Sequence, residues 1–325
     1  MTRKQPRGSR LDACSLVAER QGGTRRPDVV TCEICGYRGG TLHRAREMMF
    51  GSRKEFSYQE CHGCGCLSLL DVPLDLSPYY PEGYYSMEKP RTNALRKVRD
   101  RLYLSALFSP LVNWRHRSDL DAIRRCGLRK DQRLLDVGCG AGRLIYDLRQ
   151  LGYRAEGIDA FIGADARDQS GVRVRKIGIS EVRDRYELIL FRHSLEHMPD
   201  QIGTLAAARD RLAPGGTLVV CIPVIGWAWR HYGVCWSQLD APRHLFLHTV
   251  NSFRLAAGKA RLRVERIVYD SDDFQFWGSE LYRQDKPLHG SRRPGRLEMM
   301  RMRRRAAQLN RRRDGDKVQF YLRAV

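Results

Sequence analysis

The stretch Leu134-Leu-Asp-Val-Gly-Cys-Gly-Ala-Gly-Arg143 decides the fold class of this 325-residue chain. It predicts a buried strand that runs directly into three glycines, Gly138, Gly140 and Gly142, and then into a helix over residues 143–151. Glycine lets the backbone turn tightly and lets a ligand approach the chain closely. We therefore expect a ligand above a helix N-terminus, at the carboxyl end of a sheet.

From residue 132 onward, β-branched and apolar runs alternate with segments of helical length. This pattern predicts an α/β domain: a Rossmann-like, seven-stranded, mostly parallel sheet with helices on both faces. The expected strands are 133–137, 154–158, 172–177, 187–192, 217–222, 262–269 and 318–323. The basic stretch 292–313, with Arg-Met-Arg-Arg-Arg at its centre, is expected to be a solvated helix before the last strand.

The spacing of the glycine loop indicates its ligand. A dinucleotide-binding loop has the pattern Gly-x-Gly-x-x-Gly, whereas here the third glycine comes one residue early and position 143 is arginine. The carboxylate of Asp136 would repel a pyrophosphate, but it suits the cationic amino-acid end of S-adenosylmethionine. Asp159, at the end of the second expected strand, can accept hydrogen bonds from both ribose hydroxyls. The loop therefore predicts binding of S-adenosylmethionine.

Two later segments carry a family resemblance. Tyr186-Glu-Leu-Ile-Leu-Phe-Arg-His-Ser-Leu-Glu-His-Met-Pro-Asp200 resembles the fourth-strand segment of small-molecule class I methyltransferases. Leu212-Ala-Pro-Gly-Gly-Thr-Leu-Val-Val-Cys-Ile-Pro223 resembles their turn and fifth strand, and the resemblance covers about residues 132–270. It implies that the methionine end is lined by Asp136, Gly138, Gly140 and Gly142, the ribose by Asp159, and the adenine by Ile179 or Ser180. His193, after the fourth strand, is expected to contact the cofactor and is also a candidate catalytic residue.

Four of the ten cysteines form two pairs, Cys32-Glu-Ile-Cys35-Gly and Cys61-His-Gly-Cys64-Gly. Two residues separate the thiols of each pair, and the following glycine tolerates the positive φ of a tight turn around a metal. The doubled pattern predicts a structural zinc with four thiolate ligands. Redox dithiols and an iron–sulfur centre are the alternatives, with Cys66 or His62 as substitute ligands.

The cysteine pairs resemble the N-terminal zinc module of methyltransferases that act on nucleotide-linked deoxysugars, and Pro81-Glu-Gly-Tyr-Tyr85 resembles the linker of that group. We expect four regions: a mobile basic extension (1–30), a zinc-ribbon-like module (31–75), an aromatic linker and helical lid (76–130) and a methyltransferase domain (131–325). The chain shows neither an apolar run of membrane-spanning length nor a secretory signal, which predicts a cytoplasmic protein.

Two clusters offer candidates for proton transfer to and from a methyl acceptor. His193, Glu196 and His197 follow the fourth strand and would share one face of a helix. The alternative for Glu196 and His197 is that they cap and orient the loop.

The second cluster, residues 238–248, follows the fifth strand. We expect His244 to be the catalytic base and Arg243 to bind phosphate, with Asp240 beside them. The alternative is that the histidine of this segment packs against the sheet. Four aromatic residues are expected either to wall the acceptor pocket or to lie in the core: Trp227, Trp229, Tyr232 and Trp236.

The net charge of +21 favours acidic partners. The first functional hypothesis is a methyltransferase for a phosphorylated small molecule: a sugar nucleotide, a glycan precursor or a secondary metabolite. We expect this acceptor between the cysteine module, residues 79–85 and residues 236–248. The alternatives are an RNA methyltransferase and an inactive protein that binds S-adenosylmethionine.

Overall fold

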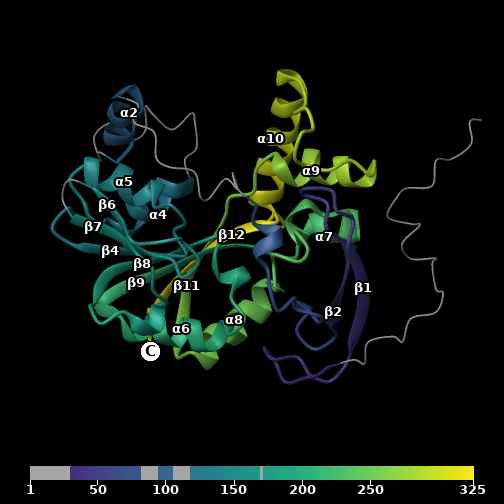
Figure 1. The fold of residues 1–325 in the computed structure, drawn as a ribbon, viewed down its shortest axis with the longest axis horizontal. Helices are drawn as coiled ribbons and strands as arrows, with labels where there is room; N and C mark the ends of the chain where they lie inside the picture. Colours follow the sequence, from purple (N-terminus) through teal and green to yellow (C-terminus); the bar gives the residue numbers. More distant parts are fainter. Residues whose placement is uncertain (1–29, 82–93, 105–117, 169–170) are drawn as a thin grey trace, which may run out of the picture.

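The computed structural model describes residues 30–81, 94–104, 118–168 and 171–325, which form two sheets surrounded by helices (Figure 1). The larger sheet has the strand order β11-β12-β9-β8-β4-β5-β7-β6. In chain order its strands are β4 (Arg133–Val137), β5 (Arg154–Ile158), β6 (Ala166–Asp168), β7 (Gly171–Arg175), β8 (Tyr186–Arg192), β9 (Leu212–Pro223), β11 (Leu262–Tyr269) and β12 (Lys317–Ala324).

The fold class predicted from the sequence is confirmed. The five strands from β9 to β7 are mutually parallel, while β12, β11 and β6 pair with their neighbours in the antiparallel sense. All seven expected strands are present, and β6 adds an eighth at the outer edge of β7. A strand of three residues is too short to show a periodic pattern, so the sequence did not indicate it.

Helices cover both faces of the large sheet, as Figure 1 shows for α4 (Ser118–Cys126) and α5 (Arg143–Gln150) against α6 (Gln201–Asp210) and α8 (Val250–Lys259). Because side chains alternate along a strand, β8 contributes to two separate clusters. Leu188 and Leu190 lie with the buried residues of α4 and α5, whereas Ile189 and Phe191 lie with those of α6 and α8. The unbroken apolar run of this strand is what burial on both faces requires.

The smaller sheet has the order β1-β2-β3-β10. Its strands are β1 (Gly40–Arg46), β2 (Glu55–Cys61), β3 (Leu67–Leu69) and β10 (Phe246–Leu247). The first three belong to the cysteine module, but β10 lies between β9 and α8. The module is therefore not a separate unit over 31–75, because residues of the predicted domain over 131–325 complete its sheet.

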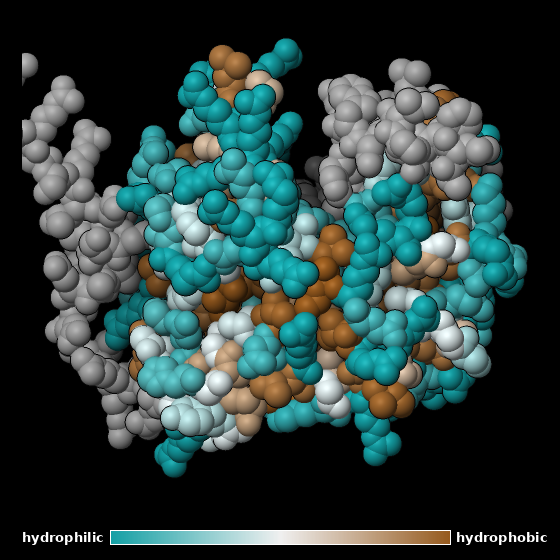
Figure 2. Space-filling model, turned by 180° about the vertical axis from the view of Figure 1, so that it is seen from behind, coloured by the Kyte–Doolittle hydropathy of each residue, from teal (hydrophilic) through white to brown (hydrophobic). Residues whose placement is uncertain are grey.

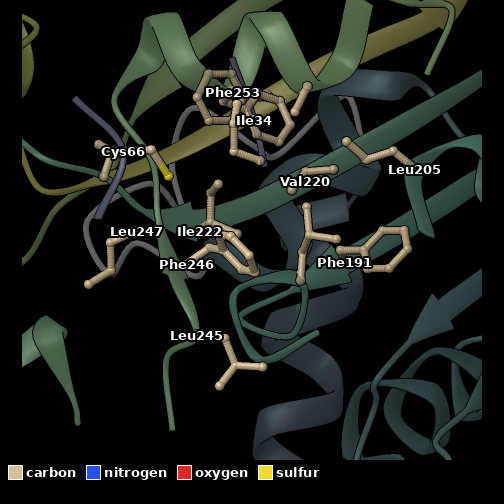
Figure 3. Close-up of a cluster of buried hydrophobic side chains, with 14 of the residues drawn as sticks. Ile34, Cys66, Phe191, Leu205, Val220, Ile222, Leu245, Phe246, Leu247 and Phe253 are labelled. Atoms are coloured by element: carbon tan, nitrogen blue, oxygen red, sulfur yellow. The ribbon is translucent and has the colours of Figure 1, made fainter. Parts of the chain in front are cut away.

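The cores of the two regions are also continuous. Figure 3 shows Ile34 and Cys66 of the cysteine module beside Phe253 of α8, and Ile222 of β9 belongs to the same cluster. Burying one such aliphatic or aromatic side chain contributes about 1.5–3 kcal/mol. The shared core therefore fixes the cysteine module firmly on the larger sheet.

The remaining elements are short helical turns and helices outside the two sheets. They are η1 (Ser77–Tyr79), α2 (Ala94–Leu104), η3 (Ile179–Glu181), η4 (Leu195–His197), α7 (Trp227–Tyr232), η5 (Gly233–Cys235), η6 (Ser237–Leu239), α9 (Phe274–Arg283) and α10 (Arg296–Arg311).

The expected solvated basic helix is present as α10, which buries Ala306 and Leu309 and exposes most of its arginines. Figure 2 shows it projecting from the molecule with a mostly hydrophilic surface. The predicted extension over 1–30 and much of the predicted lid lie outside the described residues. Among the described helices, none has the length and apolar character needed to cross a membrane.

Candidate functional site

The glycine loop joins β4 to α5 at the carboxyl edge of the sheet. Gly138, Gly140 and Gly142 have φ values of +70°, +56° and +73°, a left-handed conformation that side chains other than glycine rarely adopt. A Cβ atom at position 138 would collide with Ser194, and one at 142 would collide with Val174. The glycines are therefore required by the turn itself and by the close packing of the loop against its own domain.

Two carboxylates flank this loop. Asp136 is buried at the end of β4, and its Oδ2 lies 3.5 Å from Nε of Arg192. Asp159 follows β5 and accepts a hydrogen bond from the backbone N–H of Gly140 at 2.8 Å and another from that of Phe161 at 2.9 Å. The side chain of Asp159 thus ties the glycine loop to the next strand.

The other predicted cofactor residues lie along the same edge. Ile179 is buried at the start of η3, after β7, and its neighbour Ser180 is exposed. His193 directly follows β8. The topology therefore brings all the predicted cofactor residues to the ends of four neighbouring strands, β7, β5, β4 and β8. Their contacts with a cofactor remain a prediction.

His193 has two unusual features. Its backbone φ is +53°, an uncommon conformation for a residue other than glycine and one that is found more often at functional sites. Its Nδ1 lies 3.4 Å from Oε1 of the buried Glu196, while its side chain is 36% exposed. A proton on Nδ1 would face the carboxylate and leave the lone pair of Nε2 available to a ligand.

Arg243 does not lie where a phosphate could reach it, so the role predicted for it is wrong. The side chain is fully buried, and its Nη2 lies 2.5 Å from Oδ1 of Asp240 and 3.1 Å from Oε1 of Glu47. Its Nη1 donates a hydrogen bond to the carbonyl of Tyr79 at 3.1 Å. Because both neighbouring carboxylates are themselves partly or fully buried, the guanidinium neutralises charge inside the protein. It also joins the cysteine module to the segment after β9.

His244, the expected base, is also enclosed. Its Nδ1 donates a hydrogen bond to the carbonyl of Gln238 at 2.7 Å, and its side chain is 7% exposed. Burial lowers the pKa of His244 to about 4, and the nearby His197 adds to this effect. The ring is therefore uncharged at neutral pH and has little surface to offer an acceptor. This arrangement matches the alternative of a packed histidine.

His197 of the first predicted cluster contacts the second cluster. Its Nδ1 donates a hydrogen bond to the carbonyl of Arg243 at 2.8 Å and lies 3.2 Å from the hydroxyl of Tyr80. The ring centres of His197 and His244 are 4.7 Å apart. The structure thus brings all three catalytic candidates near one carboxylate, Glu196; His193 and His197 are partly exposed, whereas His244 is buried.

For three of the four aromatic residues expected either in the pocket wall or in the core, the structure matches the core alternative. Trp229, Tyr232 and Trp236 are buried, and Nε1 of Trp236 donates a hydrogen bond to Oδ2 of Asp316 at 3.0 Å. Large aromatic rings stabilise a core through their area, and a polar ring atom then needs an internal partner. Trp227 is partly exposed, but its ring lies against Arg305 of α10.

The four predicted zinc ligands converge. Their sulfur atoms lie within 4.8 Å of one another. The Sγ distances are 3.7 Å between Cys32 and Cys64 and 3.5 Å between Cys35 and Cys61. Four thiolates around zinc at about 2.3 Å would be separated by roughly 3.8 Å, so the donor set fits this metal.

The turn after each cysteine pair has the predicted geometry. Gly36 and Gly65 have φ values of +81° and +72°, and each donates a backbone hydrogen bond to the carbonyl of the first cysteine of its pair. The two substitute ligands lie elsewhere: Cys66 is buried with Sγ donating to the carbonyl of Leu67, and Nε2 of His62 is bonded to Thr41.

Glu47 belongs to the site region but was not among the predicted residues. It is buried at the end of β1 and accepts hydrogen bonds from the backbone N–H groups of Phe50 and Ser52 in addition to its contact with Arg243. Burial raises its pKa, but these hydrogen bonds and the charge of Arg243 outweigh that effect, so the pKa of Glu47 is lowered. Nothing local in the sequence marks this residue, because its partner is 196 positions away.

Comparison with known proteins identifies the larger region. Residues 112–267 match the model of a family described as a methyltransferase domain. The match contains the glycine loop, Asp159, His193 and the strands from β4 to β9. The chain therefore contains a class I S-adenosylmethionine-dependent methyltransferase domain.

Curated relatives resemble part of this domain. The ubiquinone biosynthesis O-methyltransferase of Ruegeria pomeroyi is 34% identical over 99 residues, and that of Cereibacter sphaeroides is 31% identical over 99 residues. Each alignment covers 27% of this chain and 40% of the relative, so the chain spans about two fifths of the length of these relatives.

Solved structures of methyltransferases are similar to the chain at low identity. Geranyl diphosphate C-methyltransferase from Streptomyces coelicolor is 16% identical, with a TM-score of 0.47 over 77% of this chain and 97% of the other. The 1,6-didemethyltoxoflavin-N1-methyltransferase of Burkholderia thailandensis is 16% identical, with a TM-score of 0.40 over 83% and 96% of the two chains.

Proposed function

We propose that this protein methylates a small molecule with S-adenosylmethionine as donor, and that His193 is the general base. The observation that carries the proposal is the position of His193. It directly follows β8, the parallel neighbour of the strand that ends in the glycine loop, and Glu196 supports its ring from behind. The base is thus a different histidine from His244, which was the first choice from sequence.

The residues at the edge of the sheet fit the cofactor. Asp136 places a buried negative charge below the loop, which favours a cationic amino-acid group and disfavours a pyrophosphate. Asp159 has lone pairs beyond the two that accept backbone hydrogen bonds, so it can also bind ribose hydroxyls. When bound, S-adenosylmethionine supplies an electrophilic methyl group.

His193 would act on the acceptor. An alcohol or acidic carbon loses a proton as it gains a methyl group, and the lone pair of Nε2 can take that proton. Glu196 would then stabilise the positively charged ring through Nδ1 at 3.4 Å. The strained backbone at His193 holds the ring at the end of the strand, so orientation is fixed before an acceptor binds.

For the acceptor, we propose a sugar nucleotide, a glycan precursor or a related secondary metabolite. The support for a nucleotide-linked sugar is the resemblance of the cysteine module, together with the position of that module beside the methyltransferase region. Its docking on β10 places it at the segment after β9, which borders the carboxyl edge of the large sheet. Arg243 no longer contributes to this argument.

A mass-spectrometric product assay tests the proposed acceptor. Purified full-length protein is incubated with S-adenosylmethionine carrying a labelled methyl group and with a panel of nucleotide sugars, and separately with total RNA. We expect a mass increase of one methyl group in a nucleotide sugar, lost in His193→Gln and kept in His231→Gln, a matched change of an exposed histidine on α7. Labelling of RNA alone would overturn the proposed acceptor class.

RNA is the rival acceptor because α10 exposes several arginines, and the surface of this helix is mostly hydrophilic (Figure 2). Binding through such a helix would weaken steeply as salt rises, because each neutralised phosphate releases counterions. Replacing Arg303 and Arg304 by glutamine should then abolish methylation of RNA, whereas it should leave methylation of a nucleotide sugar unchanged.

We further propose that the four cysteines hold one structural zinc. Four thiolates leave no open coordination position, so the metal would stabilise the module and take no part in the chemistry. Elemental analysis should show zinc on the cysteines, and Cys35→Ser should expose the module to protease, because metal-binding free energy is folding free energy in such modules. Cys126→Ser on α4 is the control. A metal-free protein with a protease-resistant module would contradict this proposal.

A further inference from the structure

We infer that a cavity between α9 and α10 binds a small organic molecule that carries a diphosphate group. The cavity has a volume of about 570 Å³ and lies between the two helices (Figure 1). Sites for small ligands have volumes of about 300–1,000 Å³. Among the described residues that line it, none is a predicted cofactor or catalytic residue. The site is therefore separate from the proposed active site, and the inference does not rest on the proposed function.

The buried part of the cavity lining is apolar. Phe276 and Trp277 of α9 are buried there together with Tyr232 of α7, and Met302 of α10 is partly buried. Small-molecule sites are lined mainly by such aromatic and aliphatic side chains, which exclude water from the apolar part of a ligand. The lining therefore favours an organic ligand over a free inorganic ion.

The exposed part of the lining is positively charged. Arg301 and Arg305 lie four residues apart on α10, and Arg292 comes from the loop before that helix. In the described chain, Arg303 of α10 pairs with Asp273, whereas none of the three arginines in the cavity forms an ion pair. Like charges four residues apart share a helix face and repel each other. An anion bound between these side chains would remove that repulsion.

Two carboxylates also line the cavity, but they do not balance its charge. Oε1 of Glu280 accepts a hydrogen bond from the hydroxyl of Tyr232 at 3.1 Å and lies 3.5 Å from Nη1 of Arg283. The charge of Glu280 is thus already compensated. Glu298 is exposed in the first turn of α10. Three guanidinium groups therefore share the cavity with one uncompensated carboxylate.

A neighbouring histidine reports the positive potential. The pKa of His231 on α7 is lowered, first by burial and then by the charges of Arg305 and Arg283, against a smaller opposite effect of Glu280. Cationic neighbours disfavour a second positive charge and favour a negative one. The surroundings of the cavity therefore attract an anion.

The chemistry of the lining indicates the class of ligand. Guanidinium groups bind phosphate oxygens through paired N–H donors, and three of them suit the charge of a diphosphate better than that of a single carboxylate. The phosphates would lie at the arginines, and the organic part would lie against the buried aromatic side chains. Nucleoside diphosphates and prenyl diphosphates share this chemistry, and the probes below distinguish the two sources.

Calorimetry on the full-length protein tests the site. The probes are uridine diphosphate, dimethylallyl diphosphate, inorganic diphosphate and uridine, with S-adenosylhomocysteine present in excess to fill the cofactor site. We expect saturable binding of an organic diphosphate, about tenfold tighter than that of inorganic diphosphate because apolar surface is also buried. Uridine alone should not bind. The organic diphosphate that binds more tightly identifies the source.

Substitutions locate the binding. Arg301→Gln and Arg292→Gln should each weaken it by about tenfold or more, because each removes charged hydrogen bonds to phosphate. Arg304→Gln is the matched control: Arg304 is exposed on α10 but does not line the cavity, so this variant should keep the wild-type affinity. Because all three arginines are exposed, circular dichroism should match the wild type in every variant.

His193→Gln distinguishes this site from the proposed active site, because binding in the cavity should be unchanged by it. The inference is overturned if neither organic diphosphate binds, if inorganic diphosphate binds as tightly, or if Arg304→Gln weakens binding as much as Arg301→Gln. Loss of binding in His193→Gln but not in Arg301→Gln would also overturn it, because the diphosphate would then lie at the active site. No methyl transfer is measured, so a failure of the proposed function does not affect this result.

Discussion

Two loops with histidines leave neighbouring parallel strands at the same edge of the sheet, yet their environments are opposite. The β8 loop (residues 193–198) presents His193 with its side chain 36% exposed. In the β9 loop (residues 236–248), every residue from Ala241 to His248 is buried, and Arg243 forms ion pairs inside the protein. The comparison teaches that a position at the carboxyl edge does not by itself make a histidine catalytic.

The difference follows from what covers each loop. The β9 loop contributes β10 to the small sheet. In the same loop, the carbonyl of His244 accepts a hydrogen bond from the hydroxyl of Tyr58 at 2.8 Å. It is therefore the joint between the cysteine module and the methyltransferase domain. The β8 loop packs its Ser194 against the end of β4, where Oγ donates to the carbonyl of Val137 at 2.7 Å, and the side chain of the preceding His193 stays 36% exposed.

The largest effect is expected from replacing the proposed base, His193, and the buried His244 in turn. His193→Gln should lower kcat by about 10²–10⁴-fold with binding of S-adenosylhomocysteine kept, because it removes a general base and little else. His244→Gln should instead lower the melting temperature and leave kcat within a few-fold per folded molecule. The comparison breaks if folded His244→Gln loses activity while His193→Gln keeps it.

Arg243 gives the second test, on stability. Arg243→Ala leaves Glu47 and Asp240 without their buried cation and should lower the free energy of unfolding by about 3–5 kcal/mol. The control is Arg263→Ala on β11, which removes an exposed pair with Glu265 and should cost at most about 1 kcal/mol. Denaturant unfolding measures both. A loss no larger than that of the control would mean that the β9 loop is not the joint.

Asp316, the partner of Trp236 at the start of the β9 loop, gives a test with pH. Burial, and next the charge of Asp272, raise the pKa of Asp316 to about 6 from 3.8, although Trp236, Ser271 and Lys317 act in the other direction. The folded state therefore favours the protonated carboxyl. Its stabilisation is full below about pH 4 and is lost as pH rises through 6.

The expected result is a difference between two pH profiles. Asp316→Asn keeps an acceptor for Trp236 but cannot ionise, so at pH 8 it should avoid a penalty on the order of 2–3 kcal/mol that the wild type carries. Asp314→Asn, a half-exposed neighbour that pairs with Arg230, is the control. If the free energy of unfolding of wild type and of Asp316→Asn changed in parallel between pH 4 and 8, the raised pKa of Asp316 would be contradicted.

Tyr58 should give the smallest effect. Tyr58→Phe removes the hydrogen bond to the His244 carbonyl in a fully buried position and should cost about 1–2 kcal/mol. Tyr153→Phe, in the other core, is the matched control and should cost less. Equal losses in the two variants would show that this contact does not help to hold the β9 loop.

The features predicted well from sequence are those whose information is local. The glycine loop and the two cysteine pairs each lie within a few residues, and their left-handed glycines have the conformation that the turns require. The central strands were also predictable, because burial on both faces leaves an unbroken apolar run.

The failures concern contacts between distant segments. Glu47 and Arg243 are 196 positions apart, Trp236 and Asp316 are 80 apart, and β10 pairs with β3 across the domain boundary. The sequence of a loop that contains an arginine and a histidine is the same whether these side chains face a ligand or a buried carboxylate. Only the fold shows which, because burial decides the role of such residues.

The central claim is that the glycine loop binds S-adenosylmethionine, and calorimetry with S-adenosylhomocysteine tests it most directly. We predict one saturable site per chain in the micromolar range, abolished by Gly140→Val, where φ is +56°, and kept in Gly163→Ala, where the space around the residue is open. Tight binding of NAD by the wild type, with no binding of S-adenosylhomocysteine, would contradict the account.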